Sequence, residues 1–270
     1  MKAIISHDVD HITVWEHRND LIVPKFIVRG FIEFLLGYVS ASEIKGRLES
    51  IVKNKWHNLD ALMQFDQENG IHSTFFFGVS KGLGLNYEQK DALYWIRTLL
   101  TAGFDVGVHG IAFNNYNDMK DEFDLFKNLS GLKEFGIRMH YLRRDDNTFH
   151  KLNQLGYTFD TTKYVFKNPY LVGRLFEFPL HIMDSDLMSR RSRWQDQSLD
   201  QSKETTKKMI EDGFNEGLQY FTILFHDSYF SDLFMTWRQW YIWLIDYLKD
   251  NKIEFISYNE AIKELKGSDG

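Results

Sequence analysis

Lys2-Ala3-Ile4-Ile5-Ser6-His7-Asp8-Val9-Asp10-His11 is a short apolar run that leads directly into a group of ionisable side chains. The apolar start predicts a buried β-strand. Asp8 and Asp10 are two positions apart, so an extended chain places both carboxylates on the same side. Two such carboxylates repel each other unless a cation neutralises them or one of them stays protonated. The stretch is therefore either an ordinary polar loop or a strand end that carries chemistry.

Outward from this stretch, short apolar runs alternate with amphipathic segments, a pattern typical of a parallel sheet with connecting helices. We expect strands at residues 2–6, 72–77, 104–108, 137–142, 157–160, 175–180, 220–225 and 253–257. We expect helices at residues 87–102, 118–135, 148–155, 201–216 and 233–249, and a short helix after the last strand. A helical insertion fills residues 18–69 and ends at Asn69-Gly70, where glycine suits a left-handed helix stop.

Seven or eight strands with intervening helices predict a distorted α/β barrel, (β/α)7-8, with a helical insertion after the first strand. A doubly wound sheet is disfavoured because no Gly-rich phosphate loop follows the first strand. No linker rich in proline or glycine divides the chain, so we expect residues 1–270 to form a single catalytic domain.

The composition excludes several classes of function. The 270 residues carry a net charge of −6, so the chain offers no basic surface of the kind that binds nucleic acid, and we expect no nucleic-acid partner. The absence of cysteine removes disulfides, thiol catalysis and thiolate metal sites, leaving His, Asp, Glu and Asn as metal ligands. Residues 26–39 are apolar but too short to span a bilayer, and no signal peptide is evident, so we expect a cytoplasmic protein without a transmembrane segment.

Polar residues recur at the carboxyl ends of the expected strands, where barrel enzymes keep their sites. They are Asp8, Asp10, His109, His226 and a later group of Glu177, His181 and Asp184. Within residues 137–142, Arg138 and His140 share one face of the expected strand. This repeated placement at one end predicts a shared pocket at the barrel mouth.

Each of these residues also has a structural interpretation. His109 could be a hydrogen-bonded core histidine, although the glycines on either side of the Val108-His109 pair favour a ligand role. His226 could cap a strand, and Arg138 could pair with a surface carboxylate. We interpret His57, His72 and His150 as structural, because each begins a helix or strand without an evident partner.

Taken together, these segments resemble the polysaccharide deacetylase family, carbohydrate esterase family four. The resemblance rests on motifs in the family's order: His7-Asp8-Val9-Asp10, Thr74-Phe75-Phe76-Phe77, Asp105-Val106-Gly107-Val108-His109-Gly110, Ile137-Arg138-Met139-His140-Tyr141-Leu142-Arg143, Gly156-Tyr157-Thr158-Phe159-Asp160-Thr161-Thr162 and Leu224-Phe225-His226. The strings His140-Tyr141-Leu142-Arg143, Glu177-Phe178-Pro179-Leu180 and Met183-Asp184 are similar to a bacterial branch tied to surface-polysaccharide and O-antigen biosynthesis.

The resemblance implies a metal-dependent hydrolase that removes an acetyl group, N-acetyl or O-acetyl, from a sugar or a sugar-carrier substrate. It implies one divalent metal ion, with zinc expected, held by Asp10 and His109. Asp8 would be the general base, Arg138 would orient it, and His226 would be the general acid, with Asp184 or Asp227 keeping His226 charged.

The chain departs from the family at one metal ligand. The family has a second histidine four residues after the first, and Phe113 occupies that position here. The third ligand must come from elsewhere, from His140 or from Asn114, and we favour His140 because imidazole binds zinc-like metals better than an amide does.

Other interpretations stay open. A catalytically degenerate carbohydrate-binding protein on the same barrel is the main alternative, followed by a two-metal phosphoesterase and an interaction scaffold. Residues 188–195 contain Arg190, Arg191, Arg193 and Trp194. This segment could bind the phosphate groups of a sugar carrier through its arginines, or it could be a solvated loop. The sequence does not determine the sugar or the oligomeric state.

Overall fold

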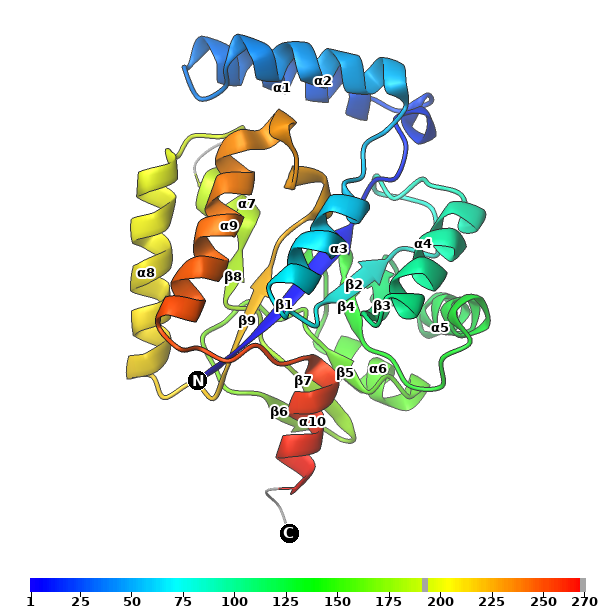
Figure 1. Ribbon diagram of the computed structural model, residues 1–270. Coiled ribbons are helices and arrows are strands. Elements are labelled where there is room, and N and C mark those ends of the chain that lie inside the picture. Colours follow the sequence, from blue (N-terminus) through cyan, green and yellow to red (C-terminus); the bar gives the residue numbers. More distant parts are fainter. Residues whose placement is uncertain (191–193, 268–270) are drawn as a thin grey trace.

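The computed structural model describes residues 1–190 and 194–267, and its centre is one curled sheet of nine strands (Figure 1). β1 (Lys2–Val9) lies between β2 (Thr74–Phe77) and β9 (Tyr220–Leu224). Beyond β2 follow, in sheet order, β3 (Asp105–Gly110), β4 (Ile137–Met139), β5 (Phe159–Asp160), β7 (Leu175–Glu177) and β6 (Tyr170–Val172), and β8 (Ile182–Met183) lies beyond β9. All neighbouring strands run parallel except β6 and β7. The carboxyl ends of the parallel strands therefore meet at one edge.

The segment that contains β7 and β8 connects the two sides of the curled sheet. β7 pairs with β5, and β8 pairs with β9. Between them, the N–H of Phe178 donates to the carbonyl of Asp160 at 2.8 Å, and the N–H of His181 donates to the carbonyl of Thr222 at 3.1 Å. One extended segment thus bonds to both sides, which confirms the expected distorted α/β barrel.

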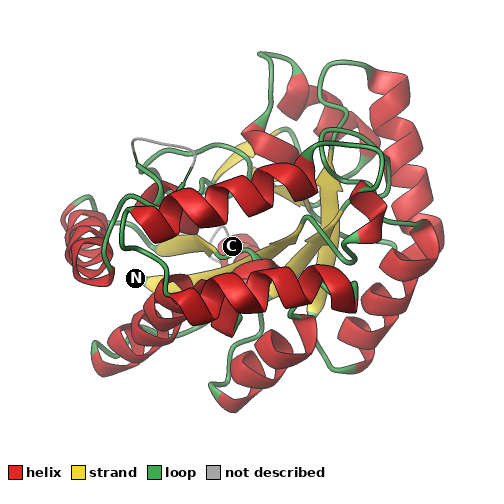
Figure 2. Ribbon diagram, turned by 90° about the horizontal axis from the view of Figure 1, so that it is seen from above, coloured by secondary structure: helices red, strands yellow, loops and turns green. Residues whose placement is uncertain are grey.

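Helices cover the outside of this sheet (Figures 1 and 2). They are α3 (Leu59–Glu68), α4 (Gln89–Thr101), α5 (Tyr116–Ser130), α6 (Thr148–Leu155), α8 (Leu199–Asn215) and α9 (Met235–Asp250). The shorter α7 (Asp184–Met188) follows β8, and four 3₁₀ segments are η1 (Trp15–His17), η2 (His140–Leu142), η3 (Asp227–Tyr229) and η4 (Asp232–Phe234). Several helices end where the sequence predicts, because Gly70 and Gly156 adopt the left-handed conformation with φ of +69° and +96°.

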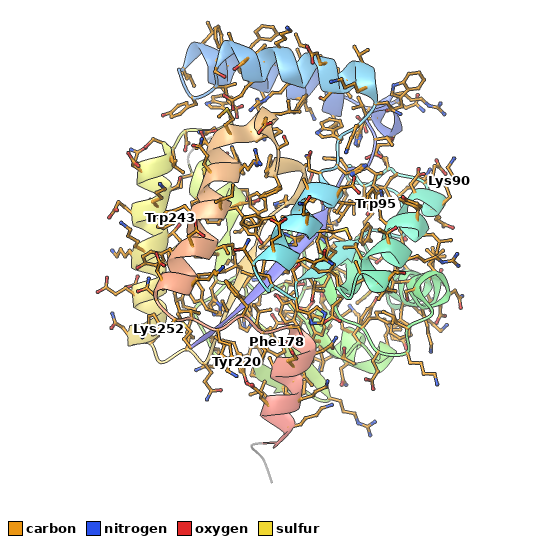
Figure 3. The ribbon with its side chains drawn as sticks, viewed as in Figure 1. Lys90, Trp95, Phe178, Tyr220, Trp243 and Lys252 are labelled. Carbon is orange, nitrogen blue, oxygen red and sulfur yellow. The ribbon has the colours of Figure 1, made fainter. Side chains whose placement is uncertain are left out.

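A cluster of aromatic rings fills the barrel at the end opposite the mouth, where α10 (Tyr258–Gly267) lies. Phe178 and Tyr220 lie near the start of this helix (Figure 3), with ring centroids 6.1 Å apart. The ring of Tyr258 stacks on Phe159 at 4.5 Å and contacts Phe178 at 5.3 Å. This packing excludes water from the barrel interior beneath the polar residues of the mouth.

The first part of the expected helical insertion consists of α1 (Ile22–Leu35) and α2 (Ala41–Lys53), which lie across the carboxyl ends of the strands (Figure 1). The last part of the expected range forms α3, which packs on the outside of the sheet with the other barrel helices. Buried Glu33 of α1 accepts a hydrogen bond from Arg29 Nε at 2.8 Å and one from Arg47 Nη1 of α2 at 2.6 Å. A buried carboxylate requires such partners, so this ion pair holds the two helices together. α1 has 14 residues, and no helix among the described residues is long and apolar enough to cross a membrane.

Several predicted elements are shorter than the sequence pattern indicates, and one does not form. The helix expected to continue to residue 135 ends at Ser130, because Gly131 takes a left-handed φ of +74° and stops it. The prediction of a strand at residues 253–257 is wrong. Only a single bridge forms there, between Ala3 and Phe255, so this segment contributes no ladder.

Two buried carboxyl groups face each other across β5 and β7, where Asp160 is the register partner of Glu177. Burial, together with the neighbouring Asp160 carboxylate, raises the pKa of Glu177 well above its usual value. The N–H of Lys163 donates to Glu177 Oε1 at 3.0 Å. We infer that the pair keeps one proton at neutral pH, because two buried like charges at this spacing repel strongly.

This pair predicts a specific pH dependence of stability. A carboxyl whose pKa is raised by folding stabilises the protein below its unfolded pKa of about 4.3, and this contribution is lost as the pH rises through the folded pKa. Glu177→Gln should therefore make the decline in unfolding free energy above pH 5 shallower, by up to about 1.4 kcal/mol per pH unit. Urea unfolding at several pH values measures this slope. The control Glu49→Gln changes an exposed carboxylate of α2 and should leave the slope unaltered, and equal slopes for all three proteins would contradict the shared proton.

Candidate active site

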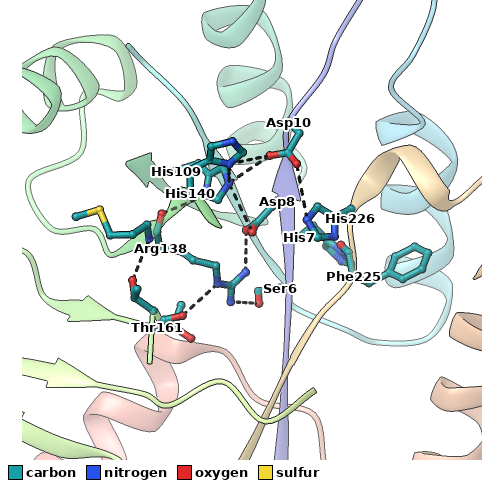
Figure 4. A network of polar contacts seen from close by, with 12 residues as sticks. Ser6, His7, Asp8, Asp10, His109, Arg138, His140, Thr161, Phe225 and His226 are labelled. Atoms are coloured by element: carbon teal, nitrogen blue, oxygen red, sulfur yellow. Dashed lines mark hydrogen bonds and ion pairs between the residues drawn. The ribbon is translucent and has the colours of Figure 1, made fainter. Parts of the chain in front are cut away.

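The guanidinium of Arg138 links β4 to β1 through the interior of the barrel mouth (Figure 4). Its Nη1 donates to Asp8 Oδ1 at 2.8 Å, and its Nη2 donates to Ser6 Oγ at 2.6 Å. Ser6 and Asp8 are alternate residues of β1 and therefore point to the same side. Arg138 Nε also donates to the carbonyl of Thr161 at 3.2 Å, so the guanidinium is held from two directions.

Burial and charge together fix the protonation of this pair. Burial opposes the ionised form of Asp8, but Arg138 outweighs it and lowers the pKa of Asp8 below its usual value. Burial likewise opposes the charged form of Arg138, whose pKa is nevertheless raised, chiefly by Asp8. The ring of Phe76 lies 4.6 Å from the guanidinium carbon. Asp8 is therefore an ionised carboxylate held in one orientation in a dry environment.

In their neutral forms, His109 and His140 each present an unprotonated nitrogen to the pocket. Burial opposes the charged form of His109, but Asp8 and Asp10 outweigh it and raise the pKa of this histidine above its ordinary value. His109 Nδ1 lies 3.1 Å from the carbonyl of Arg138, and His140 Nε2 lies 3.1 Å from the carbonyl of Leu83. A carbonyl oxygen only accepts, so these two nitrogens carry the hydrogens in the neutral rings. The lone pairs consequently sit on His109 Nε2 and His140 Nδ1, which are 2.9 Å apart.

Asp10 completes this group of three lone-pair atoms. Asp10 Oδ1 lies 3.2 Å from His109 Nε2 and 3.5 Å from His140 Nδ1, and it is buried without a hydrogen-bond donor. Burial opposes ionisation of Asp10, but the histidines hold its pKa well below the usual range. A tetrahedral zinc site with bonds of about 2.1 Å has ligand–ligand distances of about 3.4 Å. The residues present thus fit a divalent cation of this kind.

A left-handed turn after β4 places His140 in the pocket. The sequence pattern predicts a strand across residues 137–142, but the strand ends at Met139 and a 3₁₀ turn follows. Tyr141 and Leu142 have φ values of +55° and +52°, a conformation that non-glycine residues seldom adopt. The turn directs His140 into the pocket, while Tyr141 is mostly exposed and lines the outer part of the cavity.

His226 approaches the pocket from the opposite side, after β9 (Figure 4). Its Nδ1 lies 2.8 Å from Asp184 Oδ1, its backbone N–H donates to Asp184 Oδ2 at 2.7 Å, and its Nε2 lies 3.7 Å from Asp10 Oδ2. Burial opposes the charged imidazolium, but Asp184 and then Asp10 outweigh it and raise the pKa of His226 well above its usual value. His226 is therefore oriented and charged, with Nε2 facing the pocket.

Other residues highlighted by the sequence lie outside this group. Asn114 is exposed, and its carbonyl accepts from Lys151. Glu177 faces Asp160, as described above. His181 Nε2 lies 3.2 Å from the carbonyl of Lys167, and its Nδ1 accepts from the N–H of Thr222 at 3.0 Å.

Asp227 is buried but accepts from the N–H of Asn58 at 3.1 Å, and it makes no hydrogen bond to His226 in the described structure. Of the two carboxylates considered as partners of His226, the structure pairs it with Asp184.

A cavity of about 1100 Å³ opens over these residues. Besides the polar group, its lining includes α1 residues Ile22, Phe26, Arg29 and Ile32 and the aromatic residues Trp56, Tyr141, Trp194, Tyr229 and Phe234. The sequence does not predict that α1 roofs the cavity, although its apolar face is a signal that it packs on something. Arg191 and Arg193 lie outside the described residues, while Trp194 from the same segment lines the cavity.

No family model matches the chain, and no curated protein matches its sequence. Solved structures do match its fold. A structure provisionally described as a polysaccharide deacetylase from Mycobacterium smegmatis has a TM-score of 0.68 at 12% identity, covering 99% of this chain and 91% of that one. A probable polysaccharide deacetylase from Pseudomonas aeruginosa PAO1 has a TM-score of 0.58 at 11% identity, covering 97% and 88%.

PuuE allantoinase is also similar, with a TM-score of 0.56 at 16% identity over 75% of this chain and 70% of that one. At these identities the similarity concerns the fold. The chain therefore has the fold of the polysaccharide deacetylases, as the sequence resemblance implies.

Proposed function

We propose that this protein is a metal-dependent hydrolase that removes an acetyl group, in the first place N-acetyl, from a sugar or sugar-carrier substrate. One observation carries the proposal. Three lone-pair atoms of Asp10, His109 and His140 lie at the spacing of a metal ligand set, beside the ionised Asp8–Arg138 pair. The continuity of one sheet through the chain supports a single catalytic domain of residues 1–270.

Asp10, His109 and His140 would hold the ion, which we expect to be zinc. When bound, a divalent cation supplies Lewis acidity, polarising an acetyl carbonyl and lowering the pKa of a neighbouring water. The remaining steps depend on residues of the chain.

Asp8 is proposed to be the general base. Its Oδ1 is occupied by Arg138, whereas its Oδ2 lies 3.7 Å from His109 Nε2 and so faces the ligand group. A water between this oxygen and the acetyl group would lose its proton to Asp8 as its oxygen bonds to the acetyl carbon. Arg138 keeps Asp8 ionised and oriented for this transfer.

His226 is proposed to be the general acid. As the bond between the acetyl carbon and the sugar nitrogen breaks, the Nε2 proton of the imidazolium would pass to that nitrogen. Asp184 holds Nδ1 and favours the charged ring, so the proton is available on the side that faces the cavity. Acetate and the free amine are the products.

The cavity is consistent with a carbohydrate larger than a single sugar ring. Its volume of about 1100 Å³ is slightly above the range of roughly 300–1,000 Å³ common for small-molecule pockets. Its aromatic lining offers stacking surfaces for sugar rings. A role in surface-polysaccharide or O-antigen biosynthesis and a cytoplasmic location stay predictions from the sequence.

The second candidate is a carbohydrate-binding protein without catalysis. Phe113 at the position of the family's second histidine favours it, since that residue cannot bind metal. Acetate release from a panel of N- and O-acetylated sugars, measured on protein of known metal content, separates the two. Metal-loaded protein that binds these sugars and releases no acetate would support the binding protein.

Asp8→Asn should reduce kcat by about 10²- to 10⁴-fold, because it removes the proposed base. The bound metal should remain, since Asp8 is outside the ligand set. Acetate release and metal analysis on the same preparation test both parts. Asp118→Asn, an exposed carboxylate of α5, is the control and should behave like wild type. Full activity of Asp8→Asn would refute the assigned base.

His140→Ala should weaken metal binding at the proposed site by more than about 100-fold, because it removes a ligand atom. Loss of a residue that only hydrogen-bonds a ligand typically weakens metal binding by roughly 10- to 100-fold. Asn114→Ala should not change the affinity, since Asn114 is exposed and away from the cavity lining. Competition with a chromogenic chelator measures both affinities. The reverse result would make Asn114 the third ligand.

The alkaline limb of the kcat–pH profile should lie above the ordinary histidine pKa of about 6.5, because the folded protein raises the pKa of His226. Asp184→Asn removes the main charge that stabilises the imidazolium, so the alkaline limb should move to lower pH. Asp186→Asn, two residues further in α7, is the matched control and should leave the limb in place. An unmoved limb in Asp184→Asn would exclude His226 as the acid that the profile reports.

A further inference from the structure

We propose that His11, Glu16 and His17 form a second site for a divalent cation, distinct from the group of Asp10, His109 and His140. The three residues belong to the segment between β1 and α1 and include two residues of η1. None of them enters the proposed deacetylation steps, so the second site does not depend on the proposed function.

The ligand atoms converge as in a metal site. His17 Nε2 lies 2.9 Å from His11 Nδ1 and 3.1 Å from Glu16 Oε1, and His11 Nδ1 lies 3.7 Å from Glu16 Oε1. These distances bracket the value of about 3.4 Å expected between ligands of a tetrahedral zinc ion. One glutamate and two histidines are also a common ligand set for zinc.

The contacts of His17 direct one ring nitrogen at the other two residues of the group. His17 Nδ1 lies 2.9 Å from Asp20 Oδ2, and because a carboxylate accepts, the Nδ1 hydrogen is directed there. Its Nε2 is therefore the ring nitrogen that faces His11 Nδ1 and Glu16 Oε1. A proton on Nε2 contacts one acceptor in good geometry, whereas a cation at the centre contacts all three.

Each proposed ligand is held by an outer partner, as is typical of metal sites. Asp20 orients His17, and the N–H of Thr13 donates to Glu16 Oε2 at 2.8 Å. The ring of His11 stacks on Trp56 with centroids 4.9 Å apart.

An ion at this position would brace the connection to the roof of the cavity. Asp20 Oδ1 accepts from the N–H of Ile22 at 2.8 Å, at the first residue of α1, and its Oδ2 accepts from Asn86 Nδ2 at 2.9 Å. His11 lines the large cavity, so the site has a route to solvent. The ion would thus fix the start of α1 over the barrel mouth and add positive charge to the cavity wall.

Zinc titration of the metal-free, full-length protein by calorimetry tests the site. The wild type should bind two zinc ions per chain. His11→Gln and Glu16→Gln should each bind one, as should His140→Ala, and the double variant His11→Gln, His140→Ala should bind none. His150→Gln removes an exposed histidine and should still bind two. Far-UV circular dichroism establishes that each variant is folded, and anomalous diffraction at the zinc edge locates each ion.

The results separate this site from the proposed catalytic one. If the catalytic assignment is wrong but the second site exists, the wild type binds one ion that His140→Ala retains and His11→Gln loses. If His11→Gln and Glu16→Gln both bind as much zinc as the wild type, the second site does not exist. The group is then held by a proton on His17.

Discussion

The buried ion pair between Arg138 and Asp8 is the constraint on which the site depends. A fully buried guanidinium is tolerated because a carboxylate, a hydroxyl and a backbone carbonyl receive its hydrogens. Removing one partner of such a pair costs about 3–5 kcal/mol, because the other charge is left uncompensated. The pair therefore fixes β4 relative to β1 across the two strands between them. The proposed base and the strand that carries His140 are set by the same interaction.

The proposed ligand group replaces one expected histidine with a residue that directly follows the neighbouring strand. Phe113 occupies the position four residues after His109, yet His140 Nδ1 lies 2.9 Å from His109 Nε2. β3 and β4 are hydrogen-bonded neighbours, with His109 in register with Arg138. His140 is two residues after Arg138, so alternation along β4 and the left-handed turn after it bring its imidazole into the same pocket. The proposed third ligand thus comes from the end of the adjacent strand and not from the loop after His109.

The insertion changes what the barrel mouth can accommodate. α1 and α2 cover the carboxyl ends of the strands, and the buried Glu33, shared by Arg29 and Arg47, holds them as a unit. The connection from β1 to α1 carries the histidines and the glutamate of the proposed second site. Helix α1, the connection from β1 to α1 and the proposed metal ligands therefore lie along the same wall of the cavity. We expect changes in the short segment after Asp10 to affect both the proposed ligands and the position of α1.

The sequence by itself determined the alternation of strands and helices along most of the chain, the helix stops at Gly70 and Gly156, and the barrel class. It also singled out Asp8, Asp10, His109 and His226, because strand periodicity and position at strand ends depend on near neighbours in the chain. Tertiary structure placed His140, and not Asn114, beside His109, paired His226 with Asp184 instead of Asp227, and placed α1 over the cavity. These choices depend on sheet register, curl and one left-handed turn, which bring together residues far apart in the chain and leave no local signature.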